Sequence, residues 1–167
     1  MNKLYRGRFT AELEGPFVVF LIGMRVNRLW KFWEWVPVTR SMGPMLRELF
    51  THPDKGMLGA QTIFYWRGIG VLQYWRSFED LDRFARSADD PHLPAWKAFN
   101  RKAGRTGSVG IWHETYLVPA GRHETVYGNM PRFGLAAAGA HVPATGTLAT
   151  ARRRLGGEDQ EAVPATY

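Results

Sequence analysis

"MLGAQTIFYWRG" (57–68) and "IGVLQYWRS" (69–77) decide the fold of this chain. Both runs are rich in the β-branched and aromatic residues that favour strands. Gly68 and Gly70 lie where the two runs meet, and glycine tolerates the backbone conformations that a tight turn needs. The pattern therefore predicts an antiparallel hairpin in the middle of the chain, with the rest of the sheet supplied by the elements on either side.

Helices are predicted on both sides of this hairpin. Before it, residues 39–56 carry apolar side chains at spacings of three and four, which form one face of a helix: Met42, Met45, Leu46, Leu49 and Phe50. After it, residues 77–90 open with a capping box in which Ser77 caps the helix and Asp80 reaches back. Residues 90–104 restart a helix that Gly104 ends. The aromatic segment 27–38 does not decide between helix and strand.

Two further strands complete the pattern. "PFVVFLIGMRV" (16–26) and "GSVGIWHETYLV" (107–118) are rich in strand-forming residues. The order is then β-α-β-β-α-β, which predicts an α+β, ferredoxin-like domain. Helices cover one face of such a sheet, so a second copy of the chain is the economical cover for the other face. We expect the domain to span residues 1–144 and to be followed by an irregular or disordered C-terminal arm, residues 145–167.

Composition narrows the classes of function. The chain has 167 residues, which suggests one domain, and no cysteine, which excludes disulfides and thiolate chemistry. The absence of cysteine fits a reducing compartment, so we expect a cytoplasmic protein. The formal net charge is +7, but the basic residues are scattered and no nucleic-acid-binding motif accompanies them. We therefore expect no nucleic acid partner, and no membrane span, because the longest apolar run is too short for one.

Four stretches together resemble a known family. They are "YWRSFEDLDRFAR", "HLPAWKAFN", "GSVGIWHETYLV" and "YGNMPRFGLAAA", in that order. They resemble the monooxygenase-like family named after the monooxygenase of fungal fumagillin biosynthesis, which is similar to the antibiotic-biosynthesis monooxygenases. The resemblance covers roughly residues 5–140. It implies a homodimer with the dimeric α+β barrel fold and an oxygenase role.

The last strand holds the first two candidates for chemistry. Side chains alternate along a strand, so His113 and Glu114 face opposite sides of the sheet and cannot act as one dyad. His113 is either a hydrogen-bonded core histidine or a general base. Glu114 is either the ion-pair partner of an arginine, Arg25 or Arg76, or a desolvated carboxylate that moves a proton.

Arg25 and Asn27 form a second candidate pair, because they leave an otherwise apolar strand. Arg25 is suited to hold a substrate oxyanion or enolate, with Asn27 steadying the same anion. Arg25 is equally suited to pair with Glu114, and the sequence leaves both options open.

Haem is the alternative to a reaction without cofactor. His92 precedes a helix and is either a loop histidine or a haem ligand. His113 is the other candidate axial ligand. The analogy is with haem enzymes of related architecture, the aldoxime dehydratases and haem-degrading enzymes. No spacing of His, Asp and Glu predicts a metal site.

Aromatic side chains are abundant and most of them are expected in the core, with a minority lining an apolar pocket. Residues 127–135 are predicted to form a lid or a dimer-crossing segment. The candidate substrate-binding residues are Asn27, Trp33, Tyr65, Tyr74, Trp96, Tyr116 and Asn129.

Three hypotheses of function follow. The first is a cofactor-independent monooxygenase acting on a hydrophobic small molecule, for example one of secondary metabolism. In it, His113 or Glu114 removes a proton, Arg25 and Asn27 steady the anion, and the substrate's own carbanion reduces O₂. The second is a haem enzyme of the same fold. The third is a non-catalytic module that binds an apolar ligand.

Overall fold

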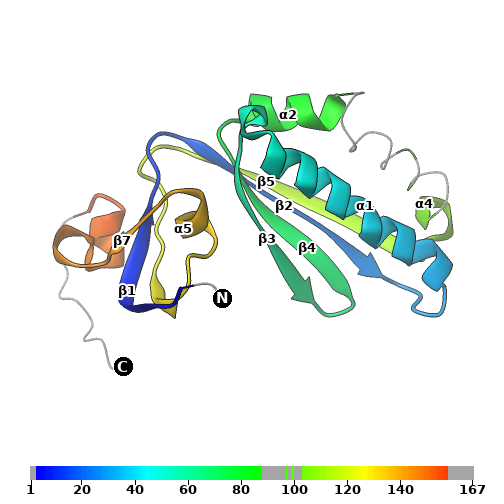
Figure 1. Ribbon diagram of the computed structural model, residues 1–167, viewed down its shortest axis with the longest axis horizontal. Helices are drawn as coiled ribbons and strands as arrows, with labels where there is room; N and C mark the ends of the chain where they lie inside the picture. The colour runs from blue at the N-terminus through cyan, green and yellow to red at the C-terminus, as the bar shows by residue number, and fades with distance from the viewer. Residues whose placement is uncertain (1–2, 88–96, 98, 100–102, 158–167) are drawn as a thin grey trace. The chain divides into compact units, whose positions relative to one another are not determined.

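A computed structural model describes residues 3–87, 97, 99 and 103–157 of the chain (Figure 1). The chain divides into two compact units. One is Val18–Tyr116, and the other combines Met1–Phe17 with Leu117–Tyr167. Each unit is built around its own antiparallel sheet, so the two are described in turn.

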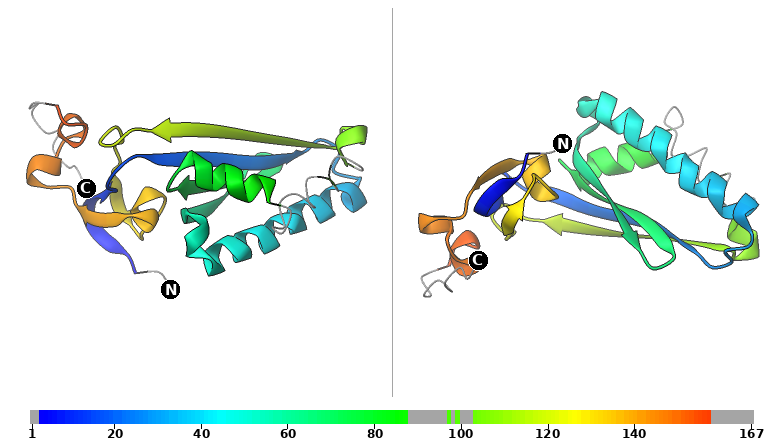
Figure 2. Two further views of the ribbon diagram at one scale, coloured as in Figure 1. Left: turned by 90° about the horizontal axis from the view of Figure 1, so that it is seen from above. Right: turned by 60° about the horizontal axis from the view of Figure 1, so that its bottom comes forward.

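The unit of residues 18–116 has the predicted ferredoxin-like order. Its sheet has the strand order β3-β4-β2-β5, formed by β2 (Phe17–Val26), β3 (Met57–Tyr65), β4 (Gly68–Trp75) and β5 (Val109–Val118). Two helices, α1 (Phe32–Thr51) and α2 (Phe78–Arg86), lie on the same side of this sheet (Figure 2). The short elements are η1 (Pro53–Lys55) and α4 (Ala103–Thr106). The α+β, ferredoxin-like prediction is thereby confirmed.

The central hairpin is confirmed, and one of its glycines, Gly68, makes room for a neighbouring side chain. The turn itself falls on Trp66 and Arg67, and Arg67 has a φ of 59°. Gly68 begins β4, and a Cβ atom there would collide with the ring of Tyr65. Glycine at this position therefore lets the tyrosine ring lie against the sheet.

Helix α1 begins earlier than predicted, because the segment that the pattern left undecided is helical from Phe32. Pro37 and Pro44 lie inside the helix on exposed positions. A proline removes one intrahelical hydrogen bond and normally indicates a break, so the sequence pattern alone could not extend the helix across them. Met45 and Leu49 are buried as predicted, whereas Phe50 is 57% exposed, so its assignment to the buried face was wrong.

The core of this unit lies between the sheet and the two helices. One cluster contains Val18, Met45, Leu49, Met57, Trp75, Leu81 and Phe84. A second cluster contains Met24, Val26 and Val109, against which Trp35 and Val38 of α1 pack. Burial of these apolar side chains holds the helices on the sheet.

Helix α2 starts at the predicted cap. The Ser77 hydroxyl accepts a hydrogen bond from the Asp80 backbone N–H at 3.1 Å. The buried Asp80 carboxylate also accepts from Arg76 Nε at 2.9 Å and from Arg83 Nη1 at 2.8 Å. These arginines hold the pKa of the Asp80 carboxyl below its usual range. Arg76, one of the two predicted partners of Glu114, is thus engaged on α2 instead.

The other unit was not predicted as a sheet. Its strand order is β6-β1-β7, formed by β6 (Tyr127–Met130), β1 (Tyr5–Glu12) and β7 (Ala140–Pro143), with α5 (Leu135–Ala138) beside them. Thr10 is buried at the centre and donates a hydrogen bond to the Thr125 carbonyl at 2.8 Å. The predicted lid segment, residues 127–135, supplies β6 of this sheet.

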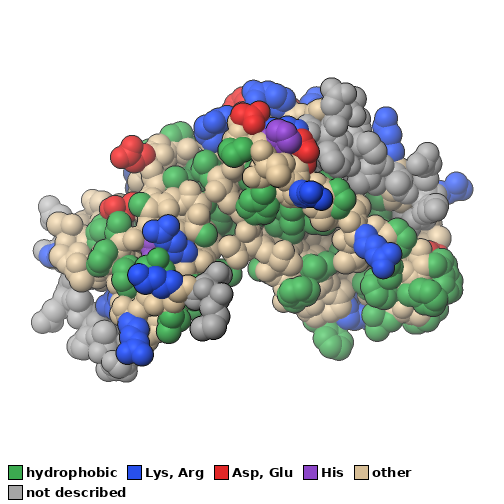
Figure 3. Space-filling view, viewed as in Figure 1, with side chains coloured by type: hydrophobic (Ala, Val, Ile, Leu, Met, Phe, Trp, Pro, Cys, Tyr) green, Lys and Arg blue, Asp and Glu red, His purple; other side chains and the backbone are tan. Residues whose placement is uncertain are grey.

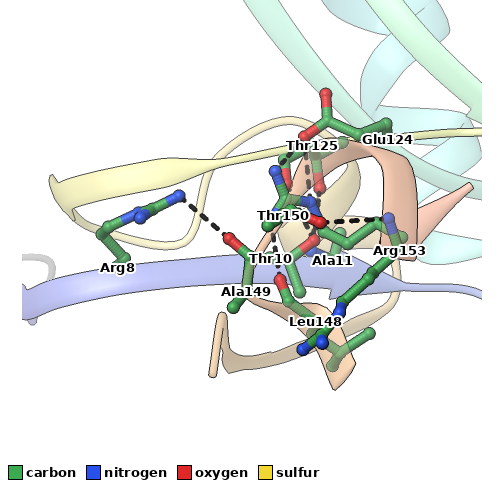
Figure 4. A network of polar contacts seen from close by, with 10 residues as sticks. Arg8, Thr10, Ala11, Glu124, Thr125, Leu148, Ala149, Thr150 and Arg153 are labelled. Carbon is green, nitrogen blue, oxygen red and sulfur yellow. Dashed lines mark hydrogen bonds and ion pairs between the residues drawn. The ribbon is translucent and has the colours of Figure 1, made fainter. Parts of the chain in front are cut away.

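The segment after residue 144 has regular structure in its described part. It forms η2 (Gly146–Leu148) and α6 (Ala151–Arg154), where the sequence predicted an irregular arm. Arg154 explains the difference, because its guanidinium binds the Glu124 carboxylate and donates to the Leu148 carbonyl at 2.6 Å. Arg8 donates to the Ala149 carbonyl from β1 (Figure 4). Side-chain contacts of this kind leave no periodic pattern in a sequence.

Neighbouring α1 residues provide a direct test of the core. Leu49 is 2% exposed, and Leu49→Ala is expected to lower the free energy of unfolding by about 2–5 kcal/mol, because it leaves a cavity. Phe50→Ala is the matched control and is expected to change it by no more than about 0.5 kcal/mol. Urea denaturation followed by circular dichroism measures both. Equal losses in the two variants would contradict the packing of α1.

Candidate functional site

A small apolar cavity lies between the sheet and the helices of the unit of residues 18–116. It is lined by Phe20, Ile22, Met42, Met45, Leu49, Gln73, Trp75, Leu81, Phe84 and Ala85. Its volume is about 30 Å³, enough for a water molecule. Pockets for organic ligands measure about 300–1,000 Å³. A larger molecule therefore enters only if side chains move, and two of the lining side chains are flexible methionines.

Gln73 is the one lining residue with a side-chain amide. It is 5% exposed, and its Oε1 accepts a hydrogen bond from Trp75 Nε1 at 2.8 Å. The indole N–H fixes which end of the amide is oxygen, so the Nε2 group is the donor end. Gln73 was missed in the sequence. The signal was a single polar residue at an inward position of the run Val71, Gln73, Trp75.

His113 lies on the same, helix-covered side of the sheet. Its ring centroid is 5.7 Å from that of Phe20, and Phe20 lines the cavity. The His113 side chain is otherwise exposed. It is therefore one side chain away from the cavity and in contact with solvent, an arrangement in which it can pass a proton to water.

Most of the other predicted residues lie on the opposite, helix-free face. There, Tyr65 donates to the Met24 carbonyl and accepts from Trp112 Nε1, both at 2.7 Å. A Cβ atom at Gly23 would come within 2.8 Å of Trp112, so this glycine makes room for the indole. Tyr74 pairs with Val19 and is 9% exposed. This face therefore carries two aromatic rings, Tyr65 and Trp112, joined by a hydrogen bond.

Arg25 and Glu114 do not form the ion pair that the sequence left open. Arg25 Nη1 donates to Asn27 Oδ1 at 2.8 Å, and Asn27 Nδ2 donates to the Gly107 carbonyl at 3.1 Å. Glu114 Oε2 accepts from the Tyr116 hydroxyl at 2.7 Å. The carboxylate raises the pKa of Tyr116 above its usual value. The pairs Arg25–Asn27 and Glu114–Tyr116 are brought together, but not with His113.

The remaining candidates lie elsewhere. Trp33 is on the first turn of α1 and is 59% exposed. Asn129 belongs to the other unit, where its Oδ1 accepts from the Gly7 N–H at 2.9 Å and holds β6 against β1. His92 and Trp96 lie outside the described residues.

Glu34 ties the start of α1 to the start of β5. Its carboxylate accepts from the hydroxyls of Ser108 and Thr106 and from Lys31 Nζ at 3.0 Å. These hydrogen bonds, led by that of Ser108, lower the pKa of the Glu34 carboxyl to about 2. This group therefore helps to fix the start of β5, the strand that carries His113.

The depressed pKa of Glu34 gives a pH test with a definite sign. Its contribution to stability is present above its ordinary pKa of 4.5 and is lost as the pH falls through about 2. Glu34→Gln is therefore expected to lower the urea midpoint at pH 7, and the difference from the unsubstituted protein is expected to shrink between pH 4.5 and pH 2. Glu79→Gln, an exposed acid in the first turn of α2, is the control. A difference that stays constant with pH would contradict the assignment.

Comparison with protein families identifies the chain. Residues 17–135 match the family described as Monooxygenase af470-like. This match covers most of the chain and includes the whole of the ferredoxin-like unit, residues 18–116. The chain belongs to the monooxygenase af470-like family. The resemblance found in the sequence is thereby confirmed.

A curated relative agrees with this membership of the monooxygenase af470-like family. Monooxygenase af470 of Aspergillus fumigatus is 26% identical over 153 residues, which cover 77% of this chain and 53% of the relative. The chain thus spans about half the length of the curated relative that it matches.

Two solved structures of low sequence identity are similar to this chain. An aldoxime dehydratase crystallised with butyraldoxime has a TM-score of 0.64 and 16% identity, over 78% of this chain and 39% of that one. SnoaB, described as a cofactor-independent oxygenase from Streptomyces nogalater, has a TM-score of 0.40 and 13% identity, over 60% of this chain and 90% of that one. The similarity to the aldoxime dehydratase shows the fold alone.

The cavity of about 30 Å³ admits neither a haem nor another organic molecule unless its side chains move, and His113 lies beside it rather than in its lining. His92, the other candidate haem ligand, lies outside the described residues. Among the described residues, no group of three or more His, Asp or Glu side chains is arranged to hold a metal ion. None of the helices in the described part of the chain is long and apolar enough to span a membrane.

Proposed function

We propose that this chain oxidises a hydrophobic small molecule with an acidic C–H bond, using O₂ and no bound cofactor. The reaction takes place in the helix-side cavity, with His113 as the base and Gln73 as the hydrogen-bond donor to the substrate anion. The observation that supports this proposal is an apolar cavity with one buried amide in its lining and one imidazole beside it. Membership of a monooxygenase family supports the reaction class.

The lining predicts the class of substrate. Apart from Gln73 and the indole N–H of Trp75, the lining side chains are aliphatic, aromatic or thioether groups. Such a surface binds flat or greasy molecules of the kind made in secondary metabolism. Met42 and Met45 come from the same helix and can change rotamer to enlarge the space.

The reaction needs a base that collects a proton and returns it. Imidazole is the side-chain group that most often acts as a general base in enzymes. His113 contacts Phe20 on one side and solvent on the other, so a proton taken from a substrate beside Phe20 has a route to water. This geometry favours His113 over Glu114, which lies on the opposite face of the same strand.

Gln73 stabilises the negative charge that deprotonation of the substrate creates. Loss of a proton next to a carbonyl group places negative charge on oxygen, and a fixed N–H donor in a dry site stabilises that charge. Because Trp75 occupies Gln73 Oε1, the amide is held with its Nε2 group as the donor end. In this scheme Gln73 takes the part that the sequence assigned to Arg25 and Asn27.

The oxidation balances without an added reductant. A substrate methylene loses a proton to His113, and the carbanion transfers electrons to O₂ and forms a C–O bond, which gives a peroxide. Protonation yields the hydroperoxide. Removal of the second C–H proton then forms the carbonyl and breaks the O–O bond, which releases water. The sum is R₂CH₂ + O₂ → R₂C=O + H₂O, with all four electrons supplied by the substrate.

Anthrone, whose methylene is activated by two aryl rings and a conjugated carbonyl, is a suitable probe. The protein is expected to consume one O₂ per anthraquinone formed, and ¹⁸O₂ is expected to place one labelled oxygen in the product. His113→Ala is expected to lower kcat by about 10²–10⁴-fold, because it removes the base. Oxygen uptake and mass spectrometry measure these effects.

Two further variants sharpen this experiment. Thr115→Ala changes the next exposed residue on the same side of β5 and is expected to leave kcat within about two-fold. Gln73→Glu keeps an oxygen for Trp75 but replaces the donor with a repelling charge, and is expected to lower kcat by about 10²–10³-fold. Binding of anthrone without oxygen uptake, or full turnover in His113→Ala, would contradict the proposal.

We also propose that the protein is a homodimer in which the helix-free face is covered by a second copy. That face presents Leu21, Ile63, Tyr65, Leu72 and Trp112, and within its own unit no helix covers it. Stacking two such sheets is the arrangement of the dimeric α+β barrel that the family resemblance implies.

Oligomeric state tests this interface. Ile63→Asp is expected to convert a dimer to a monomer, because it places a charge in the apolar contact. Thr62→Asp, on the exposed other side of the same strand, is the matched control and is expected to remain dimeric. Size-exclusion chromatography with light scattering measures the mass. A monomeric unsubstituted protein, or a dimeric Ile63→Asp variant, would overturn this arrangement.

A further inference from the structure

One end of the ferredoxin-like unit is crowded with exposed apolar side chains. We call this set the aromatic end: Leu29, Trp30, Phe32, Trp33, Phe64 and Trp66. Between 55% and 82% of each side chain is exposed. Single exposed apolar residues are ordinary, but six large ones at one end of a unit are typical of an interaction surface.

Three segments of the unit converge to form this end. Leu29 and Trp30 lie on the loop after β2, Phe32 and Trp33 on the first turn of α1, and the other two at the β3–β4 hairpin. The loop and the hairpin are joined by the Val26 N–H bond to the Arg67 carbonyl and by the Arg67 Nη2 bond to the Asn27 carbonyl, both 2.7 Å. Figure 3 shows hydrophobic side chains over these segments, with Lys and Arg side chains next to them.

The charge around the aromatic end is strongly one-sided. Residues 25–35, 64–68 and 105–107 contain five basic side chains, Arg25, Arg28, Lys31, Arg67 and Arg105, and one acid, Glu34. Five minus one gives a formal charge of +4. The single acid is already engaged by Ser108, Thr106 and Lys31, so it does not present its charge to a partner.

We propose that the aromatic end docks on an anionic lipid surface. Tryptophan prefers the headgroup level of a bilayer, where its ring is buried and its N–H stays wet. Basic residues beside an apolar insertion strengthen binding to anionic lipid. Leu29, Phe64 and Trp66 supply the insertion. Arg25, Arg28 and Arg105 supply most of the attraction, because Lys31 is paired with Glu34 and Arg67 Nη2 donates to the Asn27 carbonyl.

Charge decides against the other occupants. A second copy would bring its own +4 to the same place, and like charges repel across an interface. A nucleic acid has the right sign of charge but offers no apolar phase for Leu29 and two phenylalanines. An anionic membrane surface offers both the negative charge and the apolar phase that the aromatic end requires. It would also give the chain access to hydrophobic molecules dissolved in lipid, although the docking does not depend on the proposed reaction.

Vesicle sedimentation tests the proposal with the full chain. The protein is expected to bind phosphatidylcholine vesicles containing 30% phosphatidylserine at least about ten-fold more tightly than pure phosphatidylcholine vesicles in 0.1 M NaCl. Binding is expected to weaken at 0.5 M NaCl, because salt screens the basic residues. Trp30→Ala/Trp66→Ala is expected to weaken it at least about ten-fold.

Phe50→Ala is the matched control. Phe50 is also exposed, but it lies at the other end of α1, so vesicle binding is expected to be unchanged. Circular dichroism and light scattering confirm that each variant keeps its fold and mass. Failure to bind anionic vesicles, or equal binding by the double variant, overturns the proposal. A change of oligomeric mass in the double variant also overturns it and makes the end an interface between copies. Displacement from vesicles by an equal charge of oligonucleotide overturns the choice of lipid.

Discussion

The buried indole of Trp75 is the contact on which both the core and the candidate site depend. Trp75 is fully buried between the sheet and the helices, so its N–H has to find an acceptor away from water. Gln73, two residues earlier on the same face of β4, provides it. The same hydrogen bond fixes the orientation of the amide in the cavity. A group that folding requires is thus also the group to which the proposed reaction assigns the substrate anion.

The two faces of the sheet divide the chemistry of the chain. The helix-covered face holds the apolar cavity, Gln73 and His113, whereas the helix-free face holds the hydrogen-bonded rings of Tyr65 and Trp112. Strand geometry enforces this division, because neighbouring residues of β5 point to opposite sides. His113 and Glu114 are adjacent in sequence and separated in space for that reason. The proposed reaction uses one face and the proposed dimer uses the other.

Much of the ferredoxin-like unit could be predicted from local patterns, because its hairpin, the strands β2 and β5 and the capped helix are long enough for their residue types or capping residues to indicate them. The start of α1 could not be predicted, because Pro37 and Pro44 lie inside it and proline normally ends a helix. Strands β6 and β7 have four residues each, too few for a period, so the second sheet was missed. Among the site residues, His113 was found by its residue type. The orientation of the Gln73 amide, in contrast, follows only from its hydrogen bond with Trp75 in the structure. Whether Arg25 pairs with Glu114 could not be decided from the sequence, and the Arg25–Asn27 hydrogen bond was not anticipated.

The central claim, that the helix-side cavity receives the substrate, is tested most directly by methyl NMR. The chain has six methionines, and Met42 and Met45 line the cavity. Protein labelled with ¹³C at the methionine methyl groups would be titrated with anthrone under nitrogen, so that no turnover occurs. The account predicts large shifts for Met42 and Met45 and none for Met130, which lies in the other unit. Shifts confined to other methyl groups, or no saturable shift, would contradict it.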